Sequence, residues 1–255
     1  MTILFTRIKN LNLHFKIIGH GEPVILLHGW GRDMEYFTEL ARYLAQRFSV
    51  YLLDLPGFGL SVAPAEIWGS LEYAILIKHF IIKFGLIKPI LIGHSFGGKI
   101  AIHLAIFDDI AIRKLILISS SGIKLSKSLR VKLKVGFLKM AKCMTKLPLV
   151  GSIFMFNLEI YRRKFGSNDY NYANGIMRSI LIKTVQENIV GILSLIKQPV
   201  LLVWGKQDFV TPIAAGYIMQ QCISGSQLKI ITDSGHFPFI DSWQEFIKEV
   251  DIFLG

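Results

Sequence analysis

Cysteine is scarce in this chain, since only Cys143 and Cys222 occur among its 255 residues. Two thiols cannot form the disulfide framework of a small secreted domain, and they are too few for a cysteine-based metal site. We therefore expect both cysteines to be buried or half-buried packing residues. The sequence predicts no metal site.

Long apolar runs are also missing, although 52% of the residues are hydrophobic. Lys or Arg interrupts every candidate before it reaches the roughly 18 residues of a membrane-spanning helix. The segment Met1–Arg7 has no basic start, no long apolar stretch and no small-residue cleavage site, so it does not read as a secretory signal. We therefore expect a cytoplasmic protein whose length suits a single large core.

Acidic residues are few relative to basic ones: 18 Asp and Glu accompany 29 Lys and Arg, which gives a formal net charge of +11. The basic excess is concentrated between Gly122 and Phe165, where Glu159 is the single acid. The basic residues of this segment are Lys124, Lys127, Arg130, Lys132, Lys134, Lys139, Lys142, Lys146, Arg162, Arg163 and Lys164. Charge gathered in this way indicates a surface that attracts an acidic partner.

Apolar runs of strand length alternate with helical patterns through most of the chain. These runs cover residues 23–27, 48–54, 89–93, 114–118, 198–205 and 227–232. Residues 2–19 alternate more loosely, which is typical of an antiparallel hairpin at a sheet edge. The pattern predicts an α/β fold with a mostly parallel sheet and helices on both faces. It stops within 122–188, so we expect residues 1–121 and 189–255 to form the core and 122–188 an inserted helical cap.

The run at 89–93 leads into Gly93-His94-Ser95-Phe96-Gly97, and a helical pattern follows. A Gly-x-Ser-x-Gly segment between a strand and a helix is the context of a nucleophile elbow, a sharp turn that presents a serine. Glycines on either side of the serine avoid collisions in such a turn. The segment therefore predicts Ser95 as a catalytic nucleophile.

A serine nucleophile needs a base that accepts its proton and a carboxylate that orients this base. Asp208 follows the run at 198–205, and His236 follows the run at 227–232. In one known arrangement the serine, the acid and the histidine come in this chain order, each after a core strand. We predict Asp208 and His236 as the partners of Ser95. Asp233 is the nearest competing acid, and we expect it to shape a turn.

The negative oxygen formed during such a reaction needs backbone donors. One donor is expected to be the amide of Phe96, directly after the nucleophile, and the other an amide in the loop that follows the run at 23–27. In that loop, His28-Gly29-Trp30-Gly31, we predict Trp30 as the donor. The His28 ring is expected to brace the loop, whereas the role of His94 stays open.

Taken together, these motifs resemble those of the α/β-hydrolase superfamily, and they extend over about residues 20–255. Residues 27–31 and 54–61 are similar to esterases that cleave the methyl ester of pimeloyl-acyl-carrier protein, although some of those enzymes carry tryptophan at the position of His94. The resemblance implies an α/β-hydrolase fold and a triad of Ser95, Asp208 and His236 that needs no cofactor. It does not specify a substrate, because many hydrolases share this triad.

In residues 125–147, apolar side chains recur every three or four positions, with lysines largely opposite, as on an amphipathic helix. Phe137, Met140 and Met144 belong to the apolar face and are predicted to contact the substrate. The simplest interpretation is a cap helix with a solvated charged face. Two alternatives stay open: the basic surface binds an acidic acyl carrier protein, or it rests on anionic membrane lipid. Nucleic acid is not expected, since no base-reading module accompanies the charge.

The sequence as a whole predicts a carboxylesterase-like serine hydrolase that cleaves small-molecule esters of short- to medium-chain acyl groups through an acyl-enzyme. The alternatives are a hydrolase of an ester or thioester linked to an acyl carrier protein, and a carbon–carbon bond hydrolase. A catalytically silent binding protein of the same fold is a further alternative.

Overall fold

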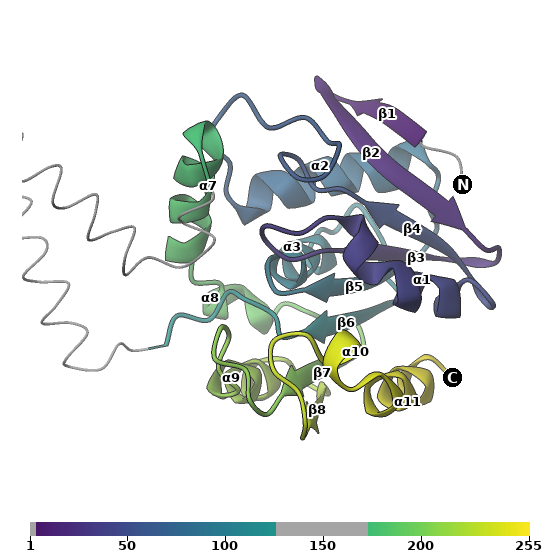
Figure 1. The fold of residues 1–255 in the computed structure, drawn as a ribbon, viewed down its shortest axis with the longest axis vertical. Helices are drawn as coiled ribbons and strands as arrows, with labels where there is room; N and C mark the ends of the chain where they lie inside the picture. The colour runs from purple at the N-terminus through teal and green to yellow at the C-terminus, as the bar shows by residue number, and fades with distance from the viewer. Residues whose placement is uncertain (1–3, 126–172) are drawn as a thin grey trace, which may run out of the picture.

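The protein is represented by a computed structural model that describes residues 4–125 and 173–255. An eight-stranded sheet crosses the molecule in the order β1-β2-β4-β3-β5-β6-β7-β8 (Figure 1). Its strands are β1 (Leu4–Ile8), β2 (Leu11–Ile18), β3 (Glu22–Leu27), β4 (Phe48–Leu53), β5 (Ile90–His94), β6 (Lys114–Ile118), β7 (Val200–Gly205) and β8 (Gln227–Ile231). The pairs β1–β2 and β2–β4 are antiparallel, and the pairs from β4 through β8 are parallel. The predicted edge hairpin and mostly parallel sheet are confirmed.

Helices lie against both faces of this sheet. They are η1 (Met34–Phe37), α1 (Thr38–Leu44), α2 (Ser70–Lys83), α3 (Phe96–Ala105), α7 (Gly175–Gln186), α8 (Val190–Leu193), α9 (Ala214–Cys222), α10 (Pro238–Asp241) and α11 (Trp243–Leu254). Buried side chains of α2, α3, α8 and α9 belong to one apolar cluster, and those of η1, α1, α10 and α11 belong to the other. Helices on both faces are as the sequence predicts, and the sheet separates two apolar clusters where a single large core was expected.

Strand β6 shows how the sequence produces two cores. Successive side chains of a strand point to opposite faces. Accordingly, Leu115 and Leu117 join the cluster under α2 and α3, whereas Ile116 and Ile118 join the cluster under α1 and α11. All four are inaccessible to solvent. Because both faces of the strand are buried, the residues that point to either face must be apolar. This explains why the parallel strands read as continuous apolar runs.

The helical segment between β3 and β4 is divided into the 3₁₀ turn η1 and the α-helix α1. Two aspartates fix the beginning of the turn. The Asp33 carboxylate accepts from the amide of Glu35 at 3.0 Å, and the buried Asp54 carboxylate accepts from the amide of Met34 at 2.8 Å. The second bond joins the turn to the loop after β4. Such a tertiary contact leaves no trace in the local apolar pattern.

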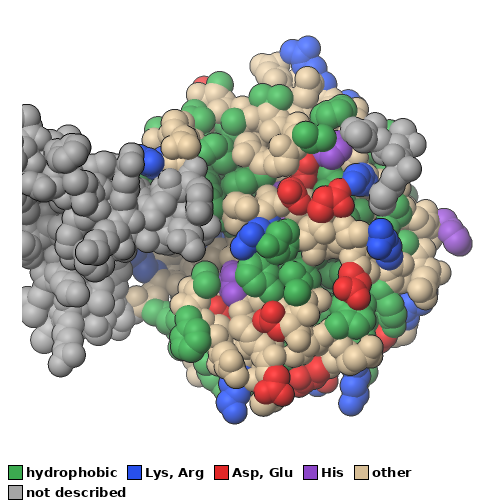
Figure 2. All heavy atoms as spheres, in the orientation of Figure 1, with side chains coloured by type: hydrophobic (Ala, Val, Ile, Leu, Met, Phe, Trp, Pro, Cys, Tyr) green, Lys and Arg blue, Asp and Glu red, His purple; other side chains and the backbone are tan. Residues whose placement is uncertain are grey.

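The predicted cap falls largely outside the described residues. Phe137, Met140, Met144 and Cys143 lie there, as do all basic residues of the 122–165 segment except Lys124. Cys222 is half-buried, as expected. On the face shown in Figure 2, acidic and basic side chains of the described part are interspersed. The division into core and cap stays a prediction, although α7 shows that the described C-terminal part of 122–188 is helical.

In the described ranges, no helix is both long enough and apolar enough to cross a membrane.

Candidate active site

Ser95 occupies the turn between β5 and α3. Its φ of 51° and ψ of −109° lie in a region that side chains other than glycine rarely adopt. A Cβ atom at Gly97 would overlap the carbonyl oxygen of Leu27, and one at Gly93 would lie 2.5 Å from the carbonyl oxygen of Gly97. The two glycines are therefore required for this turn, as the sequence motif predicts.

Hydrogen bonds to the neighbouring strand hold the strained turn. The Ser95 amide donates to the carbonyl of Ile118, the last residue of β6, at 2.9 Å. The Ser95 carbonyl in turn accepts from the amide of Ser121 at 3.0 Å. The serine is thus anchored to the end of the adjacent strand through its own backbone, and its hydroxyl has no hydrogen-bond partner among residues 4–125 and 173–255.

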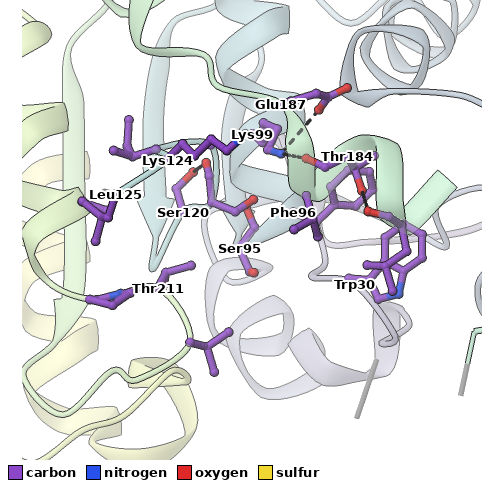
Figure 3. Close-up of a pocket in the computed structure, with 18 residues that line it drawn as sticks. Trp30, Ser95, Phe96, Lys99, Ser120, Lys124, Leu125, Thr184, Glu187 and Thr211 are labelled. Atoms are coloured by element: carbon purple, nitrogen blue, oxygen red, sulfur yellow. Dashed lines mark hydrogen bonds and ion pairs between the residues drawn. The ribbon is translucent and has the colours of Figure 1, made fainter. Parts of the chain in front are cut away.

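A cavity of about 290 Å³ opens beside Ser95. Its lining includes Trp30 from the loop after β3, Phe96 and Lys99 from α3, and Thr211 from the loop after β7 (Figure 3). In Figure 3, Ser95 lies between Thr211 on one side and Lys99 with its partners on the other. The cavity therefore brings the predicted nucleophile and both predicted oxyanion residues to one surface.

Asp208 and His236 are in direct contact. His236 Nδ1 lies 2.9 Å from Asp208 Oδ2, and the Asp208 side chain is fully buried. A carboxylate next to Nδ1 favours the tautomer that carries its proton there, which leaves Nε2 free to accept a proton. The exposed Asp233 has no such contact within the described residues. The sequence-based choice of Asp208 over Asp233 agrees with this geometry.

Thr211 organises the Asp208 carboxylate. The amides of Val210 and Thr211 donate to Oδ1 at 2.9 Å each, and the Thr211 hydroxyl lies 2.8 Å from Oδ2. The indole of the buried Trp204 donates to the Thr211 carbonyl at 2.7 Å, which fixes the loop after β7. Burial raises the pKa of Asp208, but the bonds from His236 and Thr211 outweigh it and hold that pKa below its usual value. The carboxylate is therefore ionised next to His236.

His94 supports the His236 loop. Its Nε2 lies 2.8 Å from the carbonyl oxygen of His236, and the two rings are 4.6 Å apart. Burial, together with the neighbouring His236 ring, lowers the pKa of His94 to about 3. His94 is therefore neutral, with Nε2 as the donor. The sequence left the role of His94 open, and in the structure His94 positions the loop that carries His236.

The loop after β3 approaches the serine closely. An added Cβ at Gly29 would lie 3.3 Å from the Cβ of Ser95. The buried His28 ring accepts from the Leu55 amide at 2.9 Å and donates to the Gly29 carbonyl at 2.8 Å, so it braces the loop as predicted. Burial keeps the pKa of His28 low, which fits this neutral role. Among the described residues, the amides of Trp30 and Phe96 have no acceptor.

The far side of the cavity contains a polar cluster that the sequence did not predict. Lys99 Nζ donates to the carbonyl of Thr184 at 2.6 Å and lies 3.4 Å from Glu187 Oε2. Burial lowers the pKa of Lys99, and the Glu187 carboxylate opposes this shift. Lys99 is far in sequence from both Thr184 and Glu187, so no local motif joins it to them. By contrast, Thr211 follows Asp208 by three residues, and an aspartate turn at that spacing could have indicated it.

Among the described residues, no three His, Cys, Asp or Glu side chains gather as a metal site.

Comparisons with known proteins agree with this architecture. The model of the alpha/beta hydrolase family matches residues 24–249. A pimeloyl-[acyl-carrier protein] methyl ester esterase of Legionella pneumophila is 28% identical over 255 residues, which cover 96% of this chain and 100% of that protein. An uncharacterized protein of Mycobacterium tuberculosis is 26% identical over 99% of this chain and 81% of its own length. The crystal structure of a membrane phospholipase A superimposes with a TM-score of 0.78 at 23% identity, covering 99% of this chain and 85% of that one.

Proposed function

The chain belongs to the alpha/beta hydrolase family, and from this membership we propose that it is a serine hydrolase that cleaves carboxylic esters of short- to medium-chain acyl groups. The observation that carries the proposal is the strained backbone of Ser95, which places this residue in the cavity wall next to the loop of the Asp208–His236 pair. Strain of this kind persists where the surrounding structure imposes it, often at active sites.

In the proposed mechanism, His236 Nε2 accepts the proton of the Ser95 hydroxyl while the serine oxygen attacks the ester carbonyl. The tetrahedral intermediate collapses when its carbon–oxygen bond to the alcohol breaks, and His236 returns the proton to the departing alcohol. A water molecule, deprotonated by His236, then attacks the acyl carbonyl; the bond to the Ser95 oxygen breaks, and His236 returns the proton to that oxygen. Asp208 keeps the Nδ1 proton in place during both steps.

The amides of Trp30 and Phe96 are the proposed donors to the negative oxygen of the intermediate. Both residues line the cavity, and neither amide has an acceptor among the described residues. Phe96 is also the first residue of α3, where helix amides are free and the helix dipole favours negative charge. Donors arranged in advance in this way stabilise the transition state more than the ground state.

The test combines labelling with hydrolysis. A fluorophosphonate probe should label the protein at Ser95, and Ser95→Ala should lose both the label and at least ~10³-fold of its activity on nitrophenyl esters. Ser194→Ala is the matched control, because Ser194 is exposed in the turn after α8. Labelling of another residue, or unchanged activity in Ser95→Ala, would refute the proposal. Activity that peaks at acetate and falls with chain length would refute the acyl-length assignment.

A second candidate is the hydrolysis of an ester carried by an acidic acyl carrier protein. Two observations favour it: similarity to the Legionella pneumophila esterase extends over almost the whole of both chains, and basic residues gather between Gly122 and Phe165. We expect cleavage of an acyl-carrier methyl ester to weaken steeply with salt, because charge attraction is screened. The matching small methyl ester should show no such dependence. Equal salt dependence of the two substrates would reject this candidate.

A further inference from the structure

The Lys99–Glu187 pair forms part of the cavity wall instead of filling the core behind it. Both residues line the cavity, and Lys99 is only 3% exposed. Buried lysines are rare and are almost always paired, because removing the ammonium group from water is costly. A charged pair in this place puts an ammonium and a carboxylate group on the wall of the cavity.

Lys99 keeps hydrogen-bonding capacity toward the cavity. An ammonium group has three N–H donors. Within the described part of the chain, Nζ has two acceptors, the carbonyl of Thr184 and the carboxylate of Glu187 (Figure 3). One N–H of Lys99 is therefore left without an acceptor in the described part of the chain.

Glu187 is shared between Lys99 and the beginning of α2. Its Oε1 accepts from the Ser70 amide at 2.9 Å, and its Oε2 accepts from the Ser70 hydroxyl at 2.6 Å. The opposite charges of Lys99 and Glu187 cancel locally. At the pair itself, a neutral oxygen on a ligand can accept from Lys99 without meeting a net charge, whereas a carboxylate would be repelled by Glu187. Lys124 also lines the cavity, but it is exposed to solvent, which screens its charge.

The direction of the substrate follows from the proposed reaction. The departing alcohol takes its proton from His236, so it must lie toward the end of the cavity where Thr211 approaches the His236 ring at 3.4 Å. The acyl chain then points the other way, toward Lys99. We propose that Lys99 and Glu187 form a subsite that binds a ketone or hydroxyl oxygen on the acyl chain of the substrate. This inference rests on the proposed esterase function.

The test measures kcat/KM of the wild-type protein for nitrophenyl hexanoate and for its analogues with a keto group at carbon 4 or carbon 5. Each value is divided by the rate of alkaline hydrolysis of the same ester. We expect at least one keto ester to be preferred by about 10- to 100-fold, as for a hydrogen bond to a charged group. Equal values, or a preference for an ester that ends in a carboxylate, would overturn the inference.

Variants assign this preference to the pair. Lys99→Met should abolish the preference, measured as the ratio of kcat/KM for the keto ester to kcat/KM for plain hexanoate within the same variant. Lys99→Met/Glu187→Gln covers the case in which an unpaired Glu187 prevents folding. Lys183→Met is the control, since Lys183 bonds to Glu72 on the surface and does not line the cavity. A preference that survives loss of Lys99 would show that the pair is only a structural link. If no ester is hydrolysed at all, the proposed function fails instead.

Discussion

The two ends of the cavity are built in different ways. At one end, Thr211 lines the cavity and hydrogen bonds connect it with Asp208 and His236 behind it, on loops that follow β7 and β8 and within 28 positions of the chain. At the other end, Lys99 on α3 meets Glu187, which is 88 positions away and follows α7. The first arrangement depends on turns that begin where strands end. The second depends on how helices pack against one another.

The two ends also differ in how fully their polar groups are used within the described chain. Both oxygens of the Asp208 carboxylate accept hydrogen bonds from its own loop or from His236, so the carboxylate is fixed in its orientation toward His236. Lys99 retains a donor that nothing in the described chain uses. We infer that the loop end carries the chemistry of the hydrolase and that the helix end distinguishes its substrates. Substitutions at the two ends should therefore have effects of different kinds.

The largest expected effect is at the loop end, in Asp208→Asn. Oδ1 accepts two backbone amides, so an asparagine would keep its carbonyl oxygen there and direct its NH₂ group at His236. That donor would require Nδ1 to be the acceptor, so the imidazole would carry its proton on Nε2. A protonated Nε2 cannot accept the serine proton. We expect kcat to fall by about 10⁴-fold with little change in KM, the size known for this change in a serine protease.

Asp233→Asn is the matched control for this prediction. Asp233 is exposed and lies near His236 in sequence, but its side chain has no partner in the described ranges. Its substitution should leave kcat unchanged. If Asp233→Asn were the damaging variant and Asp208→Asn the silent one, the assignment of the two acids would be reversed.

The contrast between the two ends also explains what the sequence could predict. Strand-end residues such as Ser95, Asp208 and His236 could be proposed from the sequence because parallel strands bring their carboxyl ends to one edge of the sheet. The sheet itself followed from apolar runs such as residues 114–118. Lys99 and Glu187 were missed because only the packing of α7 on α2 and α3 brings them together, and no periodicity encodes that contact.

At the helix end, Lys99→Met should lower stability. Removing one partner leaves the other charge without compensation, which costs about 3–5 kcal/mol for a fully buried pair. We expect about 2 kcal/mol here, a discount on that range, because the Glu187 side chain is 23% exposed and keeps its bonds to Ser70. Chemical denaturation measures the change. Lys99→Met/Glu187→Gln should recover most of it, and the surface variant Lys183→Met should shift stability by less than about 0.5 kcal/mol.

The smallest expected effect concerns His94, which belongs to the loop end but acts only through the His236 backbone. His94→Leu removes the donor to the His236 carbonyl, so the imidazole should be held less well and kcat should fall by about 10-fold, the worth of one hydrogen bond. His94→Gln keeps an N–H donor at a similar reach and should remain close to wild type. Equal losses in both variants would mean that ring packing against His236 matters more than the bond.

The pH dependence of stability provides an independent measurement on His94. Its pKa is about 3 in the folded protein, whereas the unfolded chain has the ordinary value of 6.5. The unfolded state therefore binds more protons between these values, so this contribution to stability is complete above pH 6.5 and is lost as pH falls toward 3. His94→Gln should show a shallower loss of stability from pH 6.5 to 4 than the wild type. Because His94 stays neutral above that range, the activity profiles of the two proteins from pH 5 to 9 should superimpose, and a shifted acid limb would show that His94 titrates during catalysis.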